Sequence, residues 1–392
     1  MEYRYHGTDI DGPTLNPEEL YVRNRNLNDL IGNLTFTGAI YHLLMGKEAT
    51  PSQEQLLDRF LSSALSSLTE EDTAIEVMKT VVASGATYSQ AIIAGLMVDK
   101  TESFAQTVAE FDLEAIGLDR DSQIGLYYVG LIPSLMVIAL ESIQWVKEDK
   151  EKFFDSQKFD GKRVLTEGKD YIESIFTLCT NRNFSDSTER KIFNDIMVSL
   201  HAGWGFLAPS VMLPRVATST RVPIQQAIAA GFTAAGPSHV GACEKAMEFF
   251  TAVHKRCSGD IEAVTIEILE DRLAKKEKIH GFGHPMFKVD SRNPRLRSII
   301  SEMDMQSDFI KIYDITAEFL NEKLGISPNI DSISAAVFLS LGMRPPYGTG
   351  LFLCSRTSAM VAHILEQKDK PPFGATSQEI RKWFGPFAIG VK

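Results

Sequence analysis

Cysteine is scarce in this chain, and its spacing excludes two classes of protein. The 392 residues contain four cysteines, with no CxxC pair and no spacing typical of zinc ligands. A disulfide-stapled secreted fold and a cysteine-based metal site are therefore not expected. We expect reduced thiols, no bound metal and a cytoplasmic protein from these residues, which are Cys179, Cys243, Cys257 and Cys354.

A signal sequence and a convincing membrane span are also lacking. The first residues, MEYRYH, contain no apolar run behind a basic segment. One stretch, 122–140, carries no charged residue, but it contains Gln123 and Pro133 and is flanked by Asp121 and Glu141. A buried core helix fits this pattern better than a membrane span. We therefore expect no membrane partner.

Positive charge is not in excess. Lysine and arginine number 40 against 51 aspartate and glutamate residues, which gives a net charge of −11 at pH 7. This balance argues against nucleic acid as the main partner, although a local basic pocket for a small anion remains possible. The GxGxxG fingerprint of dinucleotide-binding proteins is missing as well. Small-molecule substrates are the partners that we expect.

Signals for β-strands are few, and helical periodicity runs through most of the chain. The weak strand candidates are 3–5 and 350–353. At 392 residues the chain is too long for one ordinary core, so two domains are expected. Apolar residues at three-and-four spacing predict helices. The predicted helices are 56–68, 74–83, 88–98, 103–111, 190–200, 223–230, 241–252, 260–273, 309–323 and 333–341.

The segment most typical of a small-molecule site is 281–295, which reads GFGHPMFKVDSRNPR. Its two glycines can tighten a turn around one histidine. A lysine and two arginines follow, and a guanidinium can clamp a carboxylate through two parallel hydrogen bonds. We therefore expect a neutral imidazole and positive charge to meet one small polar ligand here. The residues concerned are Gly281, Gly283, His284, Lys288, Arg292 and Arg295.

Two more histidines lie at helix ends beside glycine-rich backbone. His201 precedes the irregular stretch AGWG, so it is either a satisfied core histidine or a residue that faces a cleft. His239 lies in AAGPSHVGA, where Gly-Pro ends one helix and Ser238 is a candidate N-cap of the next. In the first turn of that helix the positive helix end would keep His239 neutral. A neutral imidazole can donate a hydrogen bond to an enolate oxygen as charge develops.

A carboxylate and an arginine complete the set of candidates. Asp331 follows ISPNI and leads into an apolar helix, which is the usual setting of a helix N-cap. Burial beside apolar residues at a domain junction would instead raise its basicity and make it a general base. Arg356 lies in a later apolar helix, where it is either a surface residue or an inward-pointing cation.

Taken in order, these segments resemble sequence elements of the citrate synthase family, whose members form carbon–carbon bonds with acyl-CoA. GPSHVGACE at 236–244 resembles the family's GPxHGGAxE, and KIHGFGH at 278–284 resembles KIPGFGH. PNID at 328–331 resembles PNVD, and Arg356 with AHILEQ at 362–367 resembles ART…AHxxEQ. Four elements in the same order and spacing make a chance match implausible. The resemblance covers 195–367 and is looser before it, where 34–46 is similar to a family helix.

The resemblance implies a mainly α, citrate synthase-like fold with two domains. A large helical domain would comprise 1–221 and the return segment 331–392. A smaller helical domain, 222–330, would carry the CoA-binding elements and the GFGH loop. The active site would lie in the cleft between them, and closure of the small domain would exclude water. A homodimer paired through helices of the large domain is also implied.

The resemblance further implies the reaction and the residues that carry it. Asp331 would abstract a methyl proton from acetyl-CoA, and His239 would hydrogen-bond the resulting enolate. His284 would polarise the ketone of an α-keto acid, oxaloacetate in citrate synthase itself. Acetyl-CoA or another acyl-CoA would be a co-substrate, with no tightly bound cofactor. The residues expected near CoA are Gly281, Gly283 and Lys288.

The keto-acid residues include two departures from the family pattern. The family's HxDHE or HADHG element has two histidines, and here His201 matches the first while Trp204 replaces the second, which contacts the keto acid. The family's DPR tripeptide aligns with either DSR or NPR, and we slightly prefer Arg295 to Arg292 as the carboxylate ligand. Arg356 would hold a carboxylate too. The C-terminus lacks the Arg-Pro-Arg-like element that sends an arginine into the neighbouring subunit.

Three alternatives to a citrate synthase reaction remain open. A 2-methylcitrate synthase or another keto-acid variant would use the same residues on different substrates. A citryl-CoA lyase-like enzyme would run the cleavage direction with the same three groups. A non-catalytic CoA-binding homologue is the third, and the replacement of a histidine by Trp204 favours it.

Overall fold

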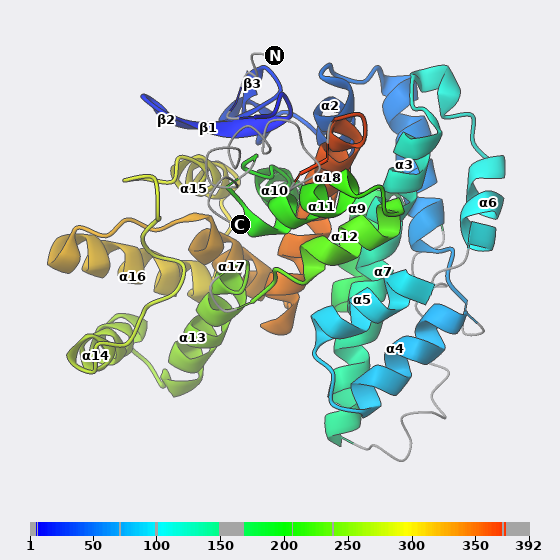
Figure 1. Cartoon of the computed structure of the whole chain (residues 1–392). Coiled ribbons are helices and arrows are strands. Elements are labelled where there is room, and N and C mark those ends of the chain that lie inside the picture. The colour runs from blue at the N-terminus through cyan, green and yellow to red at the C-terminus, as the bar shows by residue number, and fades with distance from the viewer. Residues whose placement is uncertain are drawn as a thin grey trace, which may run out of the picture.

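The chain folds into two lobes of helices with a small antiparallel sheet at one edge (Figure 1). The computed structural model describes residues 5, 7–69, 72–98, 101–148, 168–205, 207–236, 239–370 and 372–373. The prediction of a mainly α protein is confirmed over these residues. The weak strand candidate 3–5 and the C-terminal departure fall outside them, apart from Tyr5.

The larger lobe is built around the long helices α7 and α18 and fills the right side of Figure 1. Its helices are α1 (Leu27–Leu30), α2 (Phe36–Met45), α3 (Pro51–Leu65), α4 (Thr73–Ala83), α5 (Tyr88–Val98), α6 (Thr101–Ala109), α7 (Arg120–Glu148), α9 (Tyr171–Thr180), α10 (Ser187–Leu200), α11 (Pro209–Ser219), α12 (Ile224–Phe232) and α18 (Pro346–Lys368), with a 3-10 turn at Glu114–Ile116. All ten helices predicted from periodicity occur in the two lobes, and the ends of most of them are shifted by a few residues.

The apolar run at 122–140 lies in α7, at the centre of the larger lobe. This helix is long and apolar enough to cross a membrane, but 94% of its most apolar window is buried inside the protein. It packs against α3 and α18. Gly125 and Gly130 permit the close approach, because a Cβ on Gly130 would lie 2.7 Å from the carbonyl oxygen of Leu61. The prediction of a buried core helix is confirmed.

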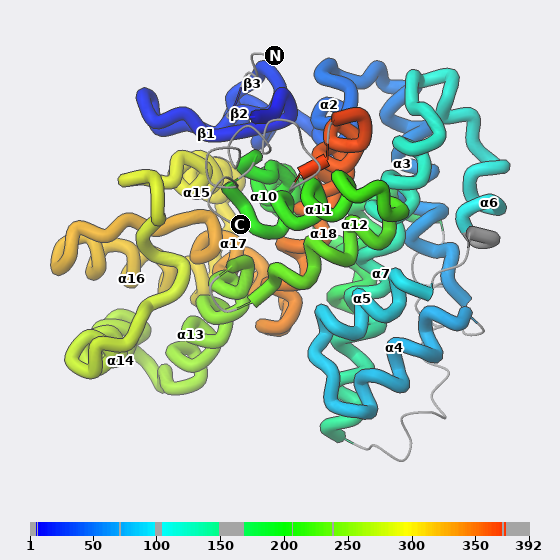
Figure 2. The backbone as a smooth tube through the Cα atoms, in the orientation of Figure 1, coloured from blue at the N-terminus to red at the C-terminus, as the bar shows by residue number. Residues whose placement is uncertain are grey.

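The smaller lobe lies beside the larger one in Figure 2, and its helices fall between α12 and α18 in the chain. They include α13 (Ala242–Arg256), α14 (Ile261–Ala274), α15 (Arg292–Glu302) and α16 (Asp308–Leu324). Helix α17 (Ile330–Ser340) packs against α13 and α16 and also against α10 of the larger lobe. Because α17 contacts both lobes, its first turn is a natural place for residues that serve a site between them.

The domain limits at 222 and 330 stay predictions. Helix α12 follows residue 222 in the chain, and it packs against α11, α5 and α18 of the larger lobe. The chain crosses to the smaller lobe in the loop between α12 and α13, and it returns through α17. This second crossing lies close to the predicted limit at 330.

The strands near the N-terminus were not predicted. β1 (Asp11–Leu15), β2 (Glu18–Val22) and β3 (Arg25–Asn26) form an antiparallel sheet in the order β1-β2-β3. They are too short and too polar for a clear period of two. The strand candidate 350–353 is wrong, because it lies inside α18, where a run of buried residues masks the helical period.

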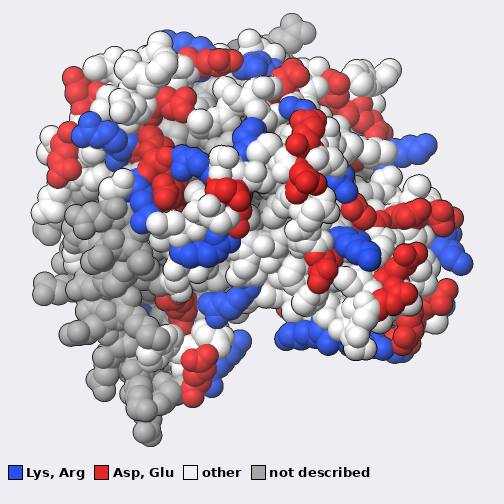
Figure 3. All heavy atoms as spheres, turned by 180° about the vertical axis from the view of Figure 1, so that it is seen from behind, with Lys and Arg blue, Asp and Glu red and all other residues white. Residues whose placement is uncertain are grey.

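Basic and acidic side chains are mixed over the described part of the face seen in Figure 3. Neither sign covers that face as a continuous patch, and the molecule is hollowed between its two lobes. A nucleic-acid-binding surface would need positive charge gathered over one region. The described part of this face has no such region.

Candidate active site

A cavity of about 540 Å³ lies where segments of both lobes meet. The larger lobe contributes the loop after α10, the start of α11 and one face of α18. The loops before α13 and after α14 and the first turns of α15 and α17 complete the wall. Its lining residues with polar or charged side chains are His239, Lys278, His280, His284, Arg292, Asn329, Asp331 and Arg356, together with the indole of Trp204.

The GFGH loop and the PNID segment are joined by a short ladder of hydrogen bonds. The backbone N–H of Gly283 donates to the Ser327 carbonyl at 2.8 Å, and that of Asn329 donates to the Gly281 carbonyl at 3.0 Å. The Asn329 side chain donates to the Gly283 carbonyl at 2.6 Å. Gly281 has a φ of +87°, and a Cβ there would lie 2.8–2.9 Å from Ser332. The glycine therefore permits both the turn and the close contact.

The carboxylate of Asp331 does not cap α17, because Asn329 does. Asn329 is the N-cap of α17, and its side chain accepts the Asp331 N–H at 2.9 Å. The N-cap alternative for Asp331 is therefore wrong, since Asp331 is the second residue of the helix. Its Oδ1 atom is buried without a hydrogen-bond partner. Burial raises the pKa of Asp331 to about 6, against the opposing effects of Arg292 and Arg356.

His239 lines the cavity from the loop before α13. The expectation that it lies in the first turn of a helix is wrong, since α13 begins at Ala242 and His239 pairs with Gly236 in a β-bridge. The candidate cap Ser238 lies outside the described residues. The positive helix end that His239 meets belongs to α11, where the Ser210 N–H points to its Nε2 at 3.3 Å.

The hydrogen bonds of His239 show which ring nitrogen carries the proton, and its pKa shows that the ring is neutral. A backbone N–H can only donate, so Nε2 accepts from Ser210 and the proton of the neutral ring is on Nδ1. The Ser210 hydroxyl lies 2.9 Å from the same Nε2. Burial lowers the pKa of His239 to about 4, and Arg356 adds to the effect. His239 is therefore a neutral hydrogen-bond donor at pH 7.

His284 is also a neutral donor, with the opposite tautomer. Its Nδ1 accepts the backbone N–H groups of Met286 at 3.2 Å and Phe287 at 3.0 Å. The ring proton of the neutral form is therefore on Nε2. Burial lowers the pKa of His284, and the positive charge of Arg292 contributes while Asp290 opposes. Two neutral imidazoles and one basic carboxylate thus line the same cavity.

Trp204 stacks on the imidazole of His284. Their ring centroids lie 5.1 Å apart with an interplanar angle of 28°, and Phe287 contacts both rings. The guanidinium carbon of Arg292 lies 5.2 Å from the centre of the Trp204 ring. The indole is buried, and it gives the cavity wall an aromatic face with no titratable group.

The two arginines that line the cavity differ in their partners. Arg292 is buried and paired with Asp290 through two hydrogen bonds of 2.9 and 2.8 Å. Arg356 is also buried, and its Nε donates to the Leu200 carbonyl at 3.4 Å. Burial lowers the pKa of Arg356 to about 10, which leaves it cationic at neutral pH. The surface alternative for Arg356 is therefore wrong.

Three of the predicted site residues do not line the cavity. Arg295 donates to the Ile31 carbonyl in the larger lobe, and Arg292 is the one of these two arginines that lines the cavity. Lys288 is exposed, and the nearby cation that lines the cavity is Lys278. His201 is fully buried, with its Nδ1 at the Val198 carbonyl and its Nε2 without a partner.

Comparison with known proteins identifies the family. The family model described as "Citrate synthase, C-terminal domain" matches residues 4–375 of this chain. The chain belongs to the citrate synthase family. The resemblance read from the four sequence elements is therefore confirmed.

Curated relatives include both citrate and 2-methylcitrate synthases. Citrate synthase 2 of Bacillus subtilis is 34% identical over 211 residues, which are 51% of this chain and 54% of that protein. A 2-methylcitrate synthase of Mycobacterium tuberculosis is 31% identical over 208 residues, 51% of this chain and 50% of that protein. The chain thus spans about half the length of these two relatives. The 2-methylcitrate synthase 2 of Corynebacterium glutamicum is 26% identical over 365 residues, with coverage of 89% and 85%.

Solved citrate synthases have the same fold. The enzyme from Pyrobaculum aerophilum superimposes with a TM-score of 0.68 at 18% identity and covers 94% of this chain and 88% of that one. The enzyme from Thermotoga maritima gives a TM-score of 0.66 at 19% identity, with coverage of 92% and 88%. The predicted citrate synthase-like architecture, with large and small helical domains, is confirmed by these likenesses.

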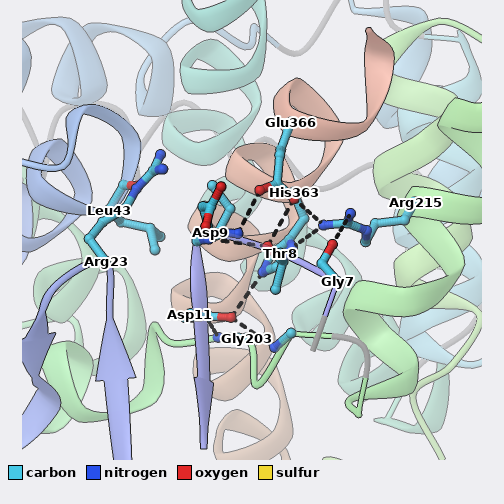
Figure 4. A network of polar contacts seen from close by, with 12 residues as sticks. Gly7, Thr8, Asp9, Asp11, Arg23, Leu43, Gly203, Arg215, His363 and Glu366 are labelled. Carbon is cyan, nitrogen blue, oxygen red and sulfur yellow. Dashed lines mark hydrogen bonds and ion pairs between the residues drawn. The ribbon is translucent and has the colours of Figure 1, made fainter. Parts of the chain in front are cut away.

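No sequence motif of this citrate synthase family member indicated the network of polar contacts that joins Asp11, Gly203, Arg215 and His363 (Figure 4). Trp204 has a φ of +62°, which is unusual for a bulky side chain. The buried carboxylate of Asp11 accepts the N–H groups on either side, from Gly203 and, at 2.8 Å, from Gly205. It also accepts Nε2–H of His363 at 2.9 Å. The N-terminal segment therefore holds the turn that carries Trp204.

Asp11 keeps its negative charge although it is buried. Burial alone would raise the pKa of Asp11, but His363 and the two amides lower it overall. Arg215 lies 2.7 Å from Nδ1 of His363, which fixes the ring proton on Nε2. Arg215 also pairs with Glu366 at 2.6 Å, and this ion pair joins α11 to α18. No local motif links Asp11 to residues almost two hundred positions away.

Proposed function

We propose that this chain condenses an acyl-CoA with an α-keto acid, as citrate and 2-methylcitrate synthases do. The observation that carries the proposal is one cavity lined by Asp331, with its raised pKa, and by two neutral imidazoles of opposite tautomer. Such a set matches the needs of carbanion chemistry, which are a base, a donor for the enolate and a donor for the ketone.

The first step is proton abstraction from the acyl-CoA. Asp331 takes a proton from the carbon next to the thioester carbonyl, and the electron pair moves onto the carbonyl oxygen. His239 donates its Nδ1–H to that oxygen as negative charge develops. A carboxylate with a pKa of about 6 is a stronger base than an exposed aspartate and still largely ionised at pH 7. The buried Oδ1 accepts no hydrogen bond from the described part of the protein, so its lone pairs are available to take the proton.

The second step forms the carbon–carbon bond. The enolate carbon attacks the keto carbon, and the π electrons of the ketone move onto its oxygen. His284 donates its Nε2–H to this oxygen and can transfer the proton as the alkoxide forms. Water then cleaves the thioester, releasing CoA as a thiol and leaving a carboxylate on the product. Removing any one of these groups should cost orders of magnitude in rate.

Binding of the two substrates is assigned to the cations and glycines around the cavity. Arg356 is the proposed ligand of the keto-acid carboxylate, since no carboxylate in the described residues pairs with it. Gly281 and Gly283 remain proposed CoA contacts, because their close backbone turn lines the cavity. Lys278 joins them as a cation at the cavity wall for a CoA phosphate, in place of Lys288.

A thiol-release assay tests the proposed function. The protein is mixed with acetyl-CoA or propionyl-CoA and a set of α-keto acids that includes oxaloacetate, and free CoA is followed with a thiol reagent. We expect release that depends on both substrates and disappears in Asp331→Asn. Absence of release with every pair would overturn the proposal. Supplying citryl-CoA separates hydrolysis to citrate from lyase-type cleavage to acetyl-CoA.

A homodimer through the larger lobe belongs to the same proposal. Helix α11 carries three exposed apolar side chains, and the loop before it adds a fourth. Exposed apolar side chains on one helix are typical of a surface that another protein chain covers. The four residues are Leu207, Met212, Leu213 and Val216.

A further inference from the structure

Of the two arginines that line the cavity, only Arg292 forms an ion pair with a carboxylate among the described residues. All three guanidinium nitrogens of Arg292 are occupied, two by Asp290 and the third by the Ser199 carbonyl at 3.4 Å. Asp290 is held in turn by the Ile330 N–H at 3.0 Å. This pair has no net charge, so Arg292 can still donate its two remaining N–H groups but brings no uncompensated positive charge to a ligand. Arg356 is therefore the arginine of the cavity wall that can neutralise a bound carboxylate.

The wall beside His284 is apolar rather than cationic. Trp204 stacks on His284 and has a single N–H donor and no protonated form. The aromatic ring of Phe352 lies 5.1 Å from the Arg356 guanidinium. Most of the remaining lining is apolar as well. The apolar part includes Leu207, Val240, Phe282, Pro285 and Met286.

Trp204 cannot readily move aside to admit a charged group. Its backbone has a positive φ, and Asp11 holds the amides on both sides of it. A Cβ on Gly203 would lie 2.8 Å from Val211, so the turn is also tightly packed. The indole is therefore a fixed part of the wall.

From these contacts we propose that the site takes an α-keto acid with one carboxylate and an apolar side chain, rather than a dicarboxylate such as oxaloacetate. Arg356 binds the carboxylate next to the ketone, and the side chain packs against Trp204. A second carboxylate packed beside Trp204 would be buried against an indole that carries no charge to compensate it, which is unfavourable. This substrate class rests on the proposed condensing function.

Binding of keto acids to the full chain tests the substrate class without requiring turnover. Dissociation constants are measured by calorimetry for 4-methyl-2-oxopentanoate and oxaloacetate at pH 7.5, with and without CoA. We expect the apolar keto acid to bind at least tenfold more tightly. Equal or tighter binding of oxaloacetate would overturn the inference.

Two variants test whether Trp204 sets the preference. Trp204→His introduces a titratable donor, and we expect it to shift the ratio of the two dissociation constants at least tenfold toward oxaloacetate. Trp204→Phe is the matched control, because it keeps an aromatic face and should leave the ratio within about twofold of the wild type. An unchanged ratio in Trp204→His, with the protein folded by circular dichroism, would contradict the role of Trp204.

The thiol-release assay on the same keto acids separates the two proposals. Release of CoA with the apolar keto acid and little with oxaloacetate supports both. Tight binding of the apolar keto acid without release for any acyl-CoA supports the substrate class and overturns the condensing function. Rapid release with oxaloacetate but not with the apolar acid supports condensation and overturns the substrate class.

Discussion

The division of labour between Asn329 and Asp331 decides what the aspartate can do. Asparagine and aspartate are both good N-caps, and either could have satisfied the first amides of α17. Asn329 takes the cap and also donates to the GFGH loop. Asp331 is left with a buried oxygen and a raised pKa. One residue provides structure, and the residue two positions on keeps its reactivity.

Asp331→Asn should lower turnover and raise stability at the same time. The amide cannot accept the proton, so we expect kcat to fall by roughly 10²–10⁴. The ionised carboxylate is disfavoured by burial, and its removal should stabilise the fold by about 1–3 kcal/mol at pH 7. Activity and urea unfolding measure the two effects. The exposed Asp29→Asn is the control that should change neither, and a destabilised Asp331→Asn would contradict the burial argument.

The pH dependence of kcat/KM should report the ionisation of Asp331 in the free protein. The active form is the carboxylate, so activity should fall about tenfold per pH unit below a pKa near 6. His239, with a pKa of about 4, stays neutral through this range. Because the folded-state pKa is raised, Asp331 stabilises the fold below its usual pKa and this contribution is lost as pH rises through about 6. An activity profile that is flat down to pH 4.5 would exclude Asp331 as the base.

At the scale of elements, periodicity predicted most helices but not how they meet. The repeats at 56–68 and 241–252 identified α3 and α13 because their apolar residues fall on one face. α15 was not predicted, because the run RNPRLR has few apolar residues and a proline. The contacts of Asp290 with Arg292 and of Ser210 with His239 depend on loop geometry, which local sequence does not specify. Only the DSR spacing could have indicated the first of them.

Asn329→Ala should damage the site more than the helix. Loss of an N-cap costs about 1 kcal/mol, and here the bond to the Gly283 carbonyl is lost as well. We expect a modest loss in stability together with at least a tenfold loss in kcat/KM. The reason is that Asn329 holds the loop of His284 and the helix of Asp331 in position relative to each other. Thr50→Ala removes the N-cap of α3 far from the cavity, and it should cost similar stability without affecting activity. Equal activity in the two variants would contradict the positioning role.

At the scale of the whole molecule, the site depends on contacts between distant parts of the chain. Residues of the larger lobe supply Trp204 and Arg356, and loops of the smaller lobe supply His239 and His284. The sequence elements predicted this convergence through the family resemblance. They could not predict the N-terminal support from Asp11, because it joins segments with no shared motif.

The exposed apolar face of α11 predicts the oligomeric state. We expect a dimer by analytical ultracentrifugation, and the double variant Met212→Glu, Val216→Glu should shift it to monomer by placing two charges in the interface. Leu324→Glu changes an equally exposed apolar residue on α16 of the smaller lobe and serves as the control. A wild-type monomer, or dissociation by the control alone, would contradict an interface on α11.

The measurement that tests the central claim most directly is release of CoA by the wild type and Asp331→Asn, side by side. Both proteins receive acetyl-CoA and a saturating keto acid from the set that includes 4-methyl-2-oxopentanoate and oxaloacetate. The expected result is thiol release that requires the keto acid and falls by at least a hundredfold in the variant. Keto-acid-dependent release at the same rate in both proteins would show that Asp331 is not the base.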